Sequence, residues 1–219
     1  MNEKTRIALF IVLHVIGSMI LFTLILALVI FSIRDWLRKY KGLDLAVFTR
    51  LQPLVNARNN RLMLGFTFLG KSQFLIPANL LLICFFLFVR HQHWYSIRAL
   101  ATALSSLVLM FLLKYLFHRR RPLYPLLNIA KGLSFPSGHA IMSVSFYGLL
   151  IYFILQTGWA SPLQYLLITM LCLLILVIGF SRVYLRVHYA SDVLVGFIVG
   201  LLWLLISLRI VQTAESLLV

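Results

Sequence analysis

The chain has 219 residues, of which 62% are hydrophobic and only 11% are charged. Soluble domains are roughly half apolar and about a quarter charged, so this composition excludes an ordinary soluble domain and indicates an integral membrane protein. The net charge is +15, but the basic residues punctuate apolar segments and form no soluble patch interleaved with aromatic residues. We therefore expect anionic lipid head groups as partners, and no nucleic acid.

Apolar runs of the length that crosses a bilayer, about 20 residues, occur six times along the chain. The first run has no small-residue cleavage site after its apolar core, and the core is too long for a signal peptide, so we expect it to be retained as a span. The six predicted spans are 7–33, 72–89, 95–117, 136–155, 163–181 and 190–211.

The segment 42–61 differs from the spans, because it mixes apolar residues with Arg50, Arg58 and Arg61 and contains Pro53. This pattern is typical of a bent amphipathic stretch at the membrane interface. The expected fold is therefore all-α: a single membrane-embedded domain over 1–219, built as a bundle of six transmembrane helices with an interfacial amphipathic segment.

Two minor features complete this prediction. Cys84 and Cys172 lie inside apolar runs, so we expect small buried hydrophobic residues and neither a disulfide nor a metal pair. Six spans place the two termini on one side, and the loops of the other side carry fifteen basic residues against five. The positive-inside rule makes the fifteen-charge face cytoplasmic.

Three short patterns fall on this basic face, at the ends of predicted spans. The first runs from Lys114 to Arg121 and Pro122, the second is Pro136-Ser137-Gly138-His139, and the third runs from Ser181 and Arg182 to His188 and Asp192.

The third pattern contains a histidine and an aspartate spaced i, i+4, which share one face if the segment is a helix. When Asp192 accepts the Nδ1 proton of His188, the Nε2 atom is left free as a nucleophile or base. For this pair alone, a polar cap at the entrance of the last span is an equally good interpretation.

The basic residues of the first and third patterns also allow two interpretations. Any one of Lys114, Arg121 and Arg182 could anchor a helix end at the head-group layer. Together they form a cluster on the side of the two histidines, and phosphate is the small anion that such a cluster most naturally binds.

The second pattern opens a predicted helix. Pro136 suits the first turn, Gly138 lets the backbone approach a ligand, and the free N–H groups there form an anion site near Ser137. His139 can give or take a proton at the edge of this site. A helix that merely begins with favourable residues would explain Pro136 and Ser137, but not His139.

Acidic residues are scarce, with Glu3, Asp35, Asp44, Asp192 and Glu215 as the whole set. Only Asp192 falls within the three patterns, and two-metal phosphatases need several carboxylates or histidines. We therefore expect a covalent histidine mechanism with no metal and no cofactor.

At this point the residues resemble the signature of the type 2 phosphatidic acid phosphatase superfamily, whose site is shared with vanadium haloperoxidases. That signature reads K-x6-R-P, then P-S-G-H, then S-R-x5-H-x3-D, and the chain fills all eleven fixed positions. They are Lys114, Arg121, Pro122, Pro136, Ser137, Gly138, His139, Ser181, Arg182, His188 and Asp192.

The resemblance implies a lipid phosphatase in which His188 attacks phosphorus, Asp192 orients it and His139 serves as acid and then base. Lys114, Arg121, Arg182 and the backbone N–H groups near Ser137 and Gly138 would hold the phosphate oxygens. Similar bacterial proteins act on undecaprenyl diphosphate, phosphatidylglycerophosphate, phosphatidate or lipid A phosphates, generally on the periplasmic face of the inner membrane. That location conflicts with the charge count, and we favour the periplasmic or extracellular face.

Two other functions stay open at the level of sequence. A lipid phosphotransferase of the same fold would share every signature residue. A non-catalytic six-span transporter or lipid-binding protein is less favoured, because the middles of the spans carry almost no charge, and a haloperoxidase is less favoured still. The oligomeric state and the physiological lipid are not predicted.

Overall fold

The structure is a computed structural model that describes residues 28, 31–126, 132–158 and 161–218. Its contacts divide the chain into two compact units, Met1–Gly42 and Leu43–Val219. In the first unit, residues 31–39 are helical. The predicted first span, 7–33, lies almost wholly outside the described residues, and everything below concerns the second unit.

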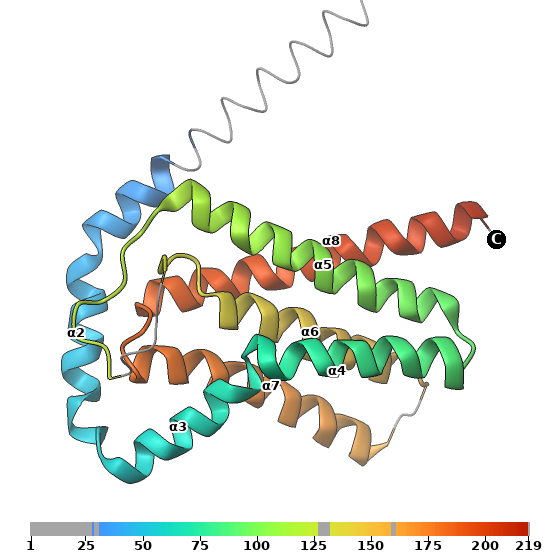
Figure 1. Ribbon diagram of the computed structural model, residues 1–219, viewed down its shortest axis with the longest axis horizontal. Helices are drawn as coiled ribbons and strands as arrows, with labels where there is room; N and C mark the ends of the chain where they lie inside the picture. Colours follow the sequence, from blue (N-terminus) through green and yellow to red (C-terminus); the bar gives the residue numbers. More distant parts are fainter. Residues whose placement is uncertain (1–27, 29–30, 127–131, 159–160, 219) are drawn as a thin grey trace, which may run out of the picture. The chain divides into compact units, whose positions relative to one another are not determined.

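Every regular element among the described residues is a helix, which confirms the predicted all-α fold class (Figure 1). A π-helical turn extends α4 at its carboxyl end. The elements are α2 (Lys41–Leu51), the 3₁₀ turn η1 (Gln52–Leu54), α3 (Ala57–Leu69), α4 (Ser72–Cys84), the π turn η2 (Phe85–Val89), α5 (His93–Phe117), α6 (Gly138–Leu155), α7 (Pro162–Tyr184) and α8 (Ala190–Leu218).

Five helical stretches of the described chain are long and apolar enough to cross a membrane. They are Ala57–Val89, His93–Phe117, Gly138–Leu155, Pro162–Tyr184 and Ala190–Leu218, and five of the six predicted spans fall on them. The main differences are at the ends: α7 and α8 continue past the predicted limits of 181 and 211.

Helix α6 is the centre of the bundle, because it contacts α4, α5, α7 and α8. Glycine allows the closest of these approaches. A Cβ atom on Gly196 of α8 would lie 2.8 Å from Ala140 Cβ and 3.0 Å from the carbonyl oxygen of Ser137. The amino-terminal parts of α6 and α8 therefore lie against each other, and this contact positions the site.

The predicted bent segment 42–61 corresponds to α2, η1 and the start of α3. Its bend is confirmed, since Pro53 lies in the first positions of η1 and Asn56 then caps α3 by accepting a hydrogen bond from Asn59 N–H at 2.9 Å. The segment also packs on the protein, because the ring of Phe48 stacks on Tyr189 with centroids 5.9 Å apart. It therefore supports the α7–α8 connection from one side.

The expectation that Cys84 and Cys172 are buried is wrong, although the two thiols are free as predicted. They lie on faces of α4 and α7 that no other described helix covers. An apolar run in a membrane protein can face lipid as readily as a protein core, and hydropathy alone does not separate these two environments.

Candidate active site

The three sequence patterns meet at one end of the bundle. Lys114 is in the last turn of α5, His139 in the first turn of α6 and Arg182 in the last turn of α7. These side chains border one cavity of about 420 Å³. Of the predicted site residues, those that line it are Lys114, Arg121, Gly138, His139, Arg182 and His188, whereas Ser137 and Asp192 lie behind it.

His188 and Asp192 face each other across 3.6 Å, measured from Nδ1 to Oδ2. The two residues do not share a helix, because α8 begins at Ala190 and His188 belongs to the turn before it. The other ring nitrogen, Nε2, lies 3.2 Å from Nη1 of Arg121. A guanidinium has no acceptor, so Nε2 presents its lone pair and Nδ1 carries the proton that faces Asp192.

Burial lowers the pKa of His188 to about 4, although Asp192 opposes the shift. Arg121 and Arg182 add to the lowering through their positive charges. Since an unperturbed histidine titrates near pH 6.5, His188 is neutral at physiological pH. A neutral imidazole with an unprotonated Nε2 is the form that can act as a nucleophile.

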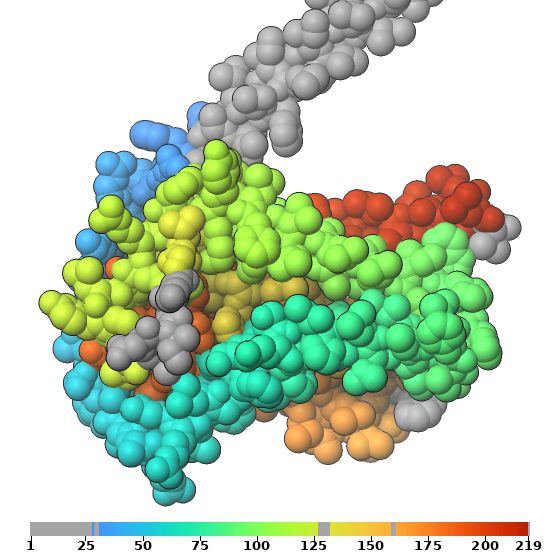
Figure 2. Space-filling view, in the orientation of Figure 1, coloured from blue at the N-terminus to red at the C-terminus, as the bar shows by residue number. Residues whose placement is uncertain are grey.

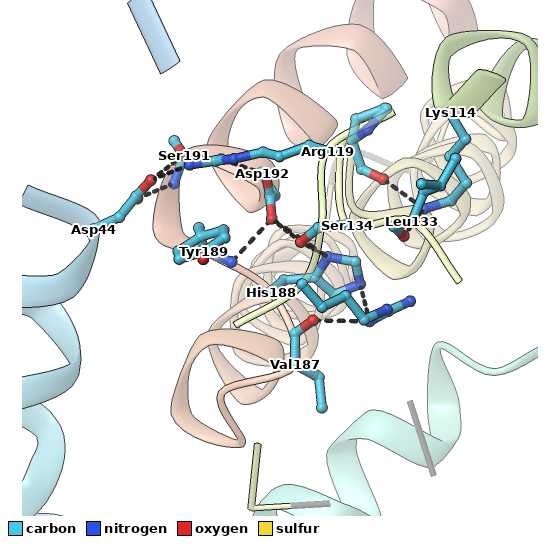
Figure 3. A network of polar contacts seen from close by, with 12 residues as sticks. Asp44, Lys114, Arg119, Leu133, Ser134, Val187, His188, Tyr189, Ser191 and Asp192 are labelled. Carbon is cyan, nitrogen blue, oxygen red and sulfur yellow. Dashed lines mark hydrogen bonds and ion pairs between the residues drawn. The ribbon is translucent and has the colours of Figure 1, made fainter. Parts of the chain in front are cut away.

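Asp192 is fully buried and accepts hydrogen bonds at each carboxylate oxygen (Figure 3). Oδ2 accepts the Ser134 hydroxyl and, at 2.9 Å, the N–H of Tyr189. Oδ1 accepts from Nη1 of Arg119 at 2.6 Å. Its backbone carbonyl also accepts the N–H of Ser137 at 3.0 Å. These bonds fix the carboxylate behind His188.

The cations around the cavity donate hydrogen bonds to neutral groups. Lys114 Nζ donates to the carbonyls of Leu133 and Pro136, each at 3.0 Å. Arg121 donates to the carbonyls of Gly132 at 3.1 Å and Val187 at 2.8 Å. Burial lowers the pKa of Arg121 from its ordinary value.

Arg182 completes this group from the end of α7. Its Nη1 donates to Thr67 Oγ1 at 3.0 Å, and its buried Nε has no hydrogen-bond partner. Within the described chain, no carboxylate lies at ion-pair distance from Lys114, Arg121 or Arg182. The cavity therefore carries an excess of positive charge.

The start of α6 differs from the prediction in one respect, the place of Pro136. The helix begins at Gly138 with Ser137 as its N-cap, so Pro136 precedes the cap and is not in the first turn. The missing side chain of Gly138 makes room for Met110, because a Cβ atom there would lie 2.6 Å from the Met110 sulfur. Nε2 of His139 and Oγ of Ser137 are buried without partners, so these polar atoms are available to a ligand.

Two charged residues near the site were missed at the sequence level. Asp44 of α2 and Arg119 form an ion pair of 2.8 Å beside Asp192, so a second carboxylate lies next to the site although it falls outside the three sequence patterns. Arg119 lies inside the Lys114–Arg121 pattern, which is a usable signal. Asp44 is distant in sequence, and no spacing rule indicates it. In the described chain, no three His, Cys, Asp or Glu side chains gather in an arrangement that could hold a metal ion.

Comparison with known proteins identifies the family. The family model of the PAP2 superfamily matches residues 94–216, which is more than half of the chain, so the protein belongs to the PAP2 superfamily and the resemblance drawn from its motifs is confirmed. Five apolar helices and the transmembrane relative described next make it a multi-pass membrane protein.

Individual relatives agree with this assignment. Phosphatidylglycerophosphatase B of Bacillus subtilis is 33% identical over 144 residues, which cover 65% of this chain and 70% of the relative. The crystal structure of the transmembrane PAP2-type phosphatidylglycerolphosphate phosphatase from Bacillus subtilis matches with a TM-score of 0.75 and 26% identity over 85% of this chain and 94% of the other. Aquifex aeolicus LpxE matches with a TM-score of 0.56 and 27% identity over 76% and 95%.

Proposed function

We propose that the protein is a membrane phosphatase that removes the terminal phosphate of a lipid phosphate or diphosphate through a phosphohistidine on His188, without a metal. One observation carries the proposal: the cavity surrounds Nε2 of His188 with Lys114, Arg121 and Arg182, and none of these cations has a carboxylate partner among the described residues. A cluster of cations that lines a cavity without a counter-charge is a site for a polyanion.

The first half of the reaction uses the two histidines in different roles. The Nε2 lone pair of His188 forms a bond to phosphorus as the bond between phosphorus and the lipid oxygen breaks. His139, whose protonated form is favoured by the negative charge of the bound phosphate, gives its proton to the departing oxygen. The three cations hold the phosphoryl oxygens, and Asp192 stabilises the positive charge that develops on the His188 ring.

The second half returns the enzyme to its starting state. His139, now neutral, takes a proton from a water molecule, whose oxygen attacks the phosphorus of the phosphohistidine. The bond from phosphorus to Nε2 breaks, its electron pair returns to His188, and inorganic phosphate leaves. Each proton that His139 gives in the first half is recovered in the second.

The cavity supports a lipid as the substrate. It extends from the histidines along α4 and α5, and from Leu100 to Lys114 it follows α5 for about 20 Å at 1.5 Å per residue. Figure 2 shows α6 at the bottom of the groove between α4 and α5. Its apolar lining includes Leu75, Ile76, Leu80, Leu104, Leu107 and Phe111. A soluble phosphate ester would leave this apolar groove without an occupant, whereas a lipid tail fills it.

Among the lipids expected from the sequence we favour phosphatidylglycerophosphate, because two of the similar proteins are named as phosphatases of this lipid. The third similar protein is LpxE. We place the site at the periplasmic or extracellular face, as in the expectation drawn from the family. The fifteen basic residues counted on this face include Lys114, Arg121 and Arg182, whose charges the proposed phosphate site explains. Arg119 and Arg186 also have partners inside the protein, Asp44 and Gln52, so the charge count is weaker evidence for a cytoplasmic face. Thiol labelling of a cysteine introduced at Tyr124, in intact cells, tests the orientation: reaction with an impermeant reagent supports it, and protection contradicts it.

The test of function is phosphate release by the detergent-purified protein in excess chelator. The panel contains phosphatidylglycerophosphate, undecaprenyl diphosphate, phosphatidate and lipid A, with His188→Ala in parallel. We expect chelator-resistant release by the wild-type protein and none by the variant. Release that needs a divalent metal, or that survives in His188→Ala, would reject the mechanism. Transfer of the phosphate to an added lipid alcohol would identify a phosphotransferase.

A further inference from the structure

A chain of buried charges leads from α2 to the catalytic pair. Arg119 donates from Nη1 to Asp192 Oδ1 at 2.6 Å and from Nη2 to Asp44 Oδ2 at 2.8 Å. The side chains of Arg119, Asp44 and Asp192 are only 14%, 5% and 0% exposed. Figure 3 shows Arg119 between the two aspartates, with His188 on the far side of Asp192.

Three charged side chains can be buried together only in a specific geometry, because a buried carboxylate destabilises the fold unless it is paired and hydrogen-bonded. The planar guanidinium has nitrogens that point in fixed directions, so one Arg119 can serve two carboxylates at once. The ring of Tyr189 lies against the guanidinium, 4.2 Å from its central carbon, and holds its plane.

The far carboxylate is fixed just as firmly. Asp44 accepts the N–H of Ser191 at 3.0 Å and its hydroxyl at 2.6 Å. The same hydroxyl accepts from Nη1 of Arg119 at 2.8 Å. Asp44 thus holds the first turn of α8, which carries Asp192, and the position of Arg119 at the same time.

This arrangement determines which oxygen of Asp192 faces the histidine. Arg119 occupies Oδ1, and Oδ2 is the atom 3.6 Å from His188 Nδ1. Without Arg119, the two aspartates would be buried close together without a cation, and protonation of one of them would relieve the repulsion. A protonated or rotated Asp192 could neither orient the His188 ring nor stabilise its positive charge.

We infer that Arg119 and Asp44 are positioning residues for the phosphoryl transfer: Arg119 keeps Asp192 ionised and directs its Oδ2 at His188, and Asp44 holds Arg119 in place. The inference rests on the proposed function. It extends the site beyond the eleven signature positions, and Asp44 lies outside the residues 94–216 that the family model matches. Arg119→Lys keeps the charge but loses the two-armed geometry, and Asp44→Asn keeps the acceptor oxygen but loses the charge.

A matched control separates this role from simple anchoring of the loop. Arg186 also binds the α2–η1 segment from the α7–α8 connection, through Gln52 of η1 and the carbonyl of Phe48 of α2, and no hydrogen bond joins it to Asp192 among the described residues. Its φ is +53°, a conformation that asparagine tolerates, so Arg186→Asn is the control. We expect Arg119→Lys to lower kcat about 10- to 100-fold, the range typical of residues that orient a catalytic group from behind. Asp44→Asn should lose less, and the control should lose the least, with KM nearly constant throughout.

The decisive experiment is a double-mutant cycle with Asp192→Asn. If Arg119 acts through Asp192, Arg119→Lys lowers kcat in the wild-type background but has little further effect on Asp192→Asn. The same fold-loss in each background would overturn the inference. Asp44→Asn runs through the same cycle, so the test survives if the Arg119 variant fails to fold in a thermal-unfolding check.

A binding measurement tests the same role without turnover. Orthovanadate can bond to a correctly oriented imidazole nitrogen, whereas inorganic phosphate needs only the cations. Calorimetry should therefore show weaker vanadate binding to Arg119→Lys and unchanged phosphate binding, and unchanged vanadate binding would overturn the inference. Because calorimetry needs no catalysis, a wild-type protein that releases no phosphate from any lipid would reject the proposed function while this experiment still decides the positioning role.

Discussion

Two cations of α5, one near each end of the helix, have different surroundings. Arg98 and Lys114 are sixteen residues apart, about 24 Å along a helix. Arg98 has its own counter-charge, because it forms an ion pair with Glu215 of α8 and lies 5.3 Å from the ring centre of Tyr95. Lys114 has only backbone carbonyls as partners.

This difference separates a structural charge from a functional one. The pair of Arg98 and Glu215 is neutral as it stands and joins α5 to α8, as does the hydrogen bond of 3.1 Å between Thr102 and Ser207. Lys114, Arg121 and Arg182 instead line a positive cavity, in which we propose that the phosphate binds. Substitutions at the catalytic end should therefore affect the rate, and those at the distal end the stability.

The largest expected effect is that of Asp192→Asn. Asparagine has nearly the same shape but cannot stabilise a positive His188, and it can present an N–H where the Nδ1 proton should lie. We expect kcat to fall by about 10³- to 10⁴-fold, as in other histidine–aspartate pairs, with phosphate binding kept. Steady-state kinetics and phosphate competition measure the two quantities, and a variant with near-normal kcat would show that the 3.6 Å contact has no catalytic role.

Arg182→Met should have the next largest effect. It removes a charged donor from the phosphate site, for which the expected loss in kcat is about 10²- to 10³-fold. Phosphate competition should weaken as well, in contrast to Asp192→Asn. Thr67→Val is the matched control, because it keeps the Arg182 charge but removes the hydroxyl that accepts from Arg182 and is also hydrogen-bonded to Ser181. Equal losses in the two variants would mean that Arg182 acts through its contact with Thr67.

At the distal end, Glu215→Gln should destabilise the protein without impairing catalysis. It leaves Arg98, whose side chain is 6% exposed, without a counter-charge. Breaking a buried ion pair costs about 3 kcal/mol or more, less where one partner is partly exposed, as Glu215 is at 32%. Thermal unfolding in detergent should show the loss, and Arg98→Met combined with Glu215→Leu should recover part of it. A kcat reduced tenfold in a folded Glu215→Gln protein would contradict the separation of the two ends.

The sequence predicted the parts of the site that lie within local patterns. The local sequence around His139, His188 and Lys114 is unusual for a membrane span, because histidine and lysine, like the neighbouring Pro136, are poor choices inside an apolar run. The helices follow from hydropathy in the same way. These predictions need only a few neighbouring residues and no knowledge of how the helices pack.

The rest depends on contacts between distant segments. Asp44 and Asp192 are 148 positions apart in sequence, and only the packing of α2 on the α7–α8 connection brings them to the same guanidinium. The contact of Gly138 with Met110 of α5 could not be predicted for a similar reason. The exposure of Cys84 and Cys172 likewise depends on which helix faces are covered.

The smallest expected effect concerns pH and again distinguishes the two ends. The pKa of His188 is lowered to about 4 by burial and by the nearby Arg121 and Arg182, against the opposing influence of Asp192. Since an unfolded histidine titrates near 6.5, the unfolded state binds more protons between these values. The contribution of His188 to the free energy of unfolding is therefore fully present above pH 6.5. It is lost as the pH drops toward 4, by up to roughly 3 kcal/mol.

Unfolding temperatures between pH 4 and pH 8 would reveal this contribution as a difference between proteins. His188→Gln has no group to protonate at this position, so its unfolding temperature should fall less steeply with acid than that of the wild-type protein. Glu215→Gln should start from a lower stability but keep the wild-type slope, because its His188 is unchanged. If the unfolding temperatures of His188→Gln and the wild type fall in parallel with acid, the pKa of His188 is not lowered by folding. The proposal that His188 is a neutral nucleophile would then be contradicted.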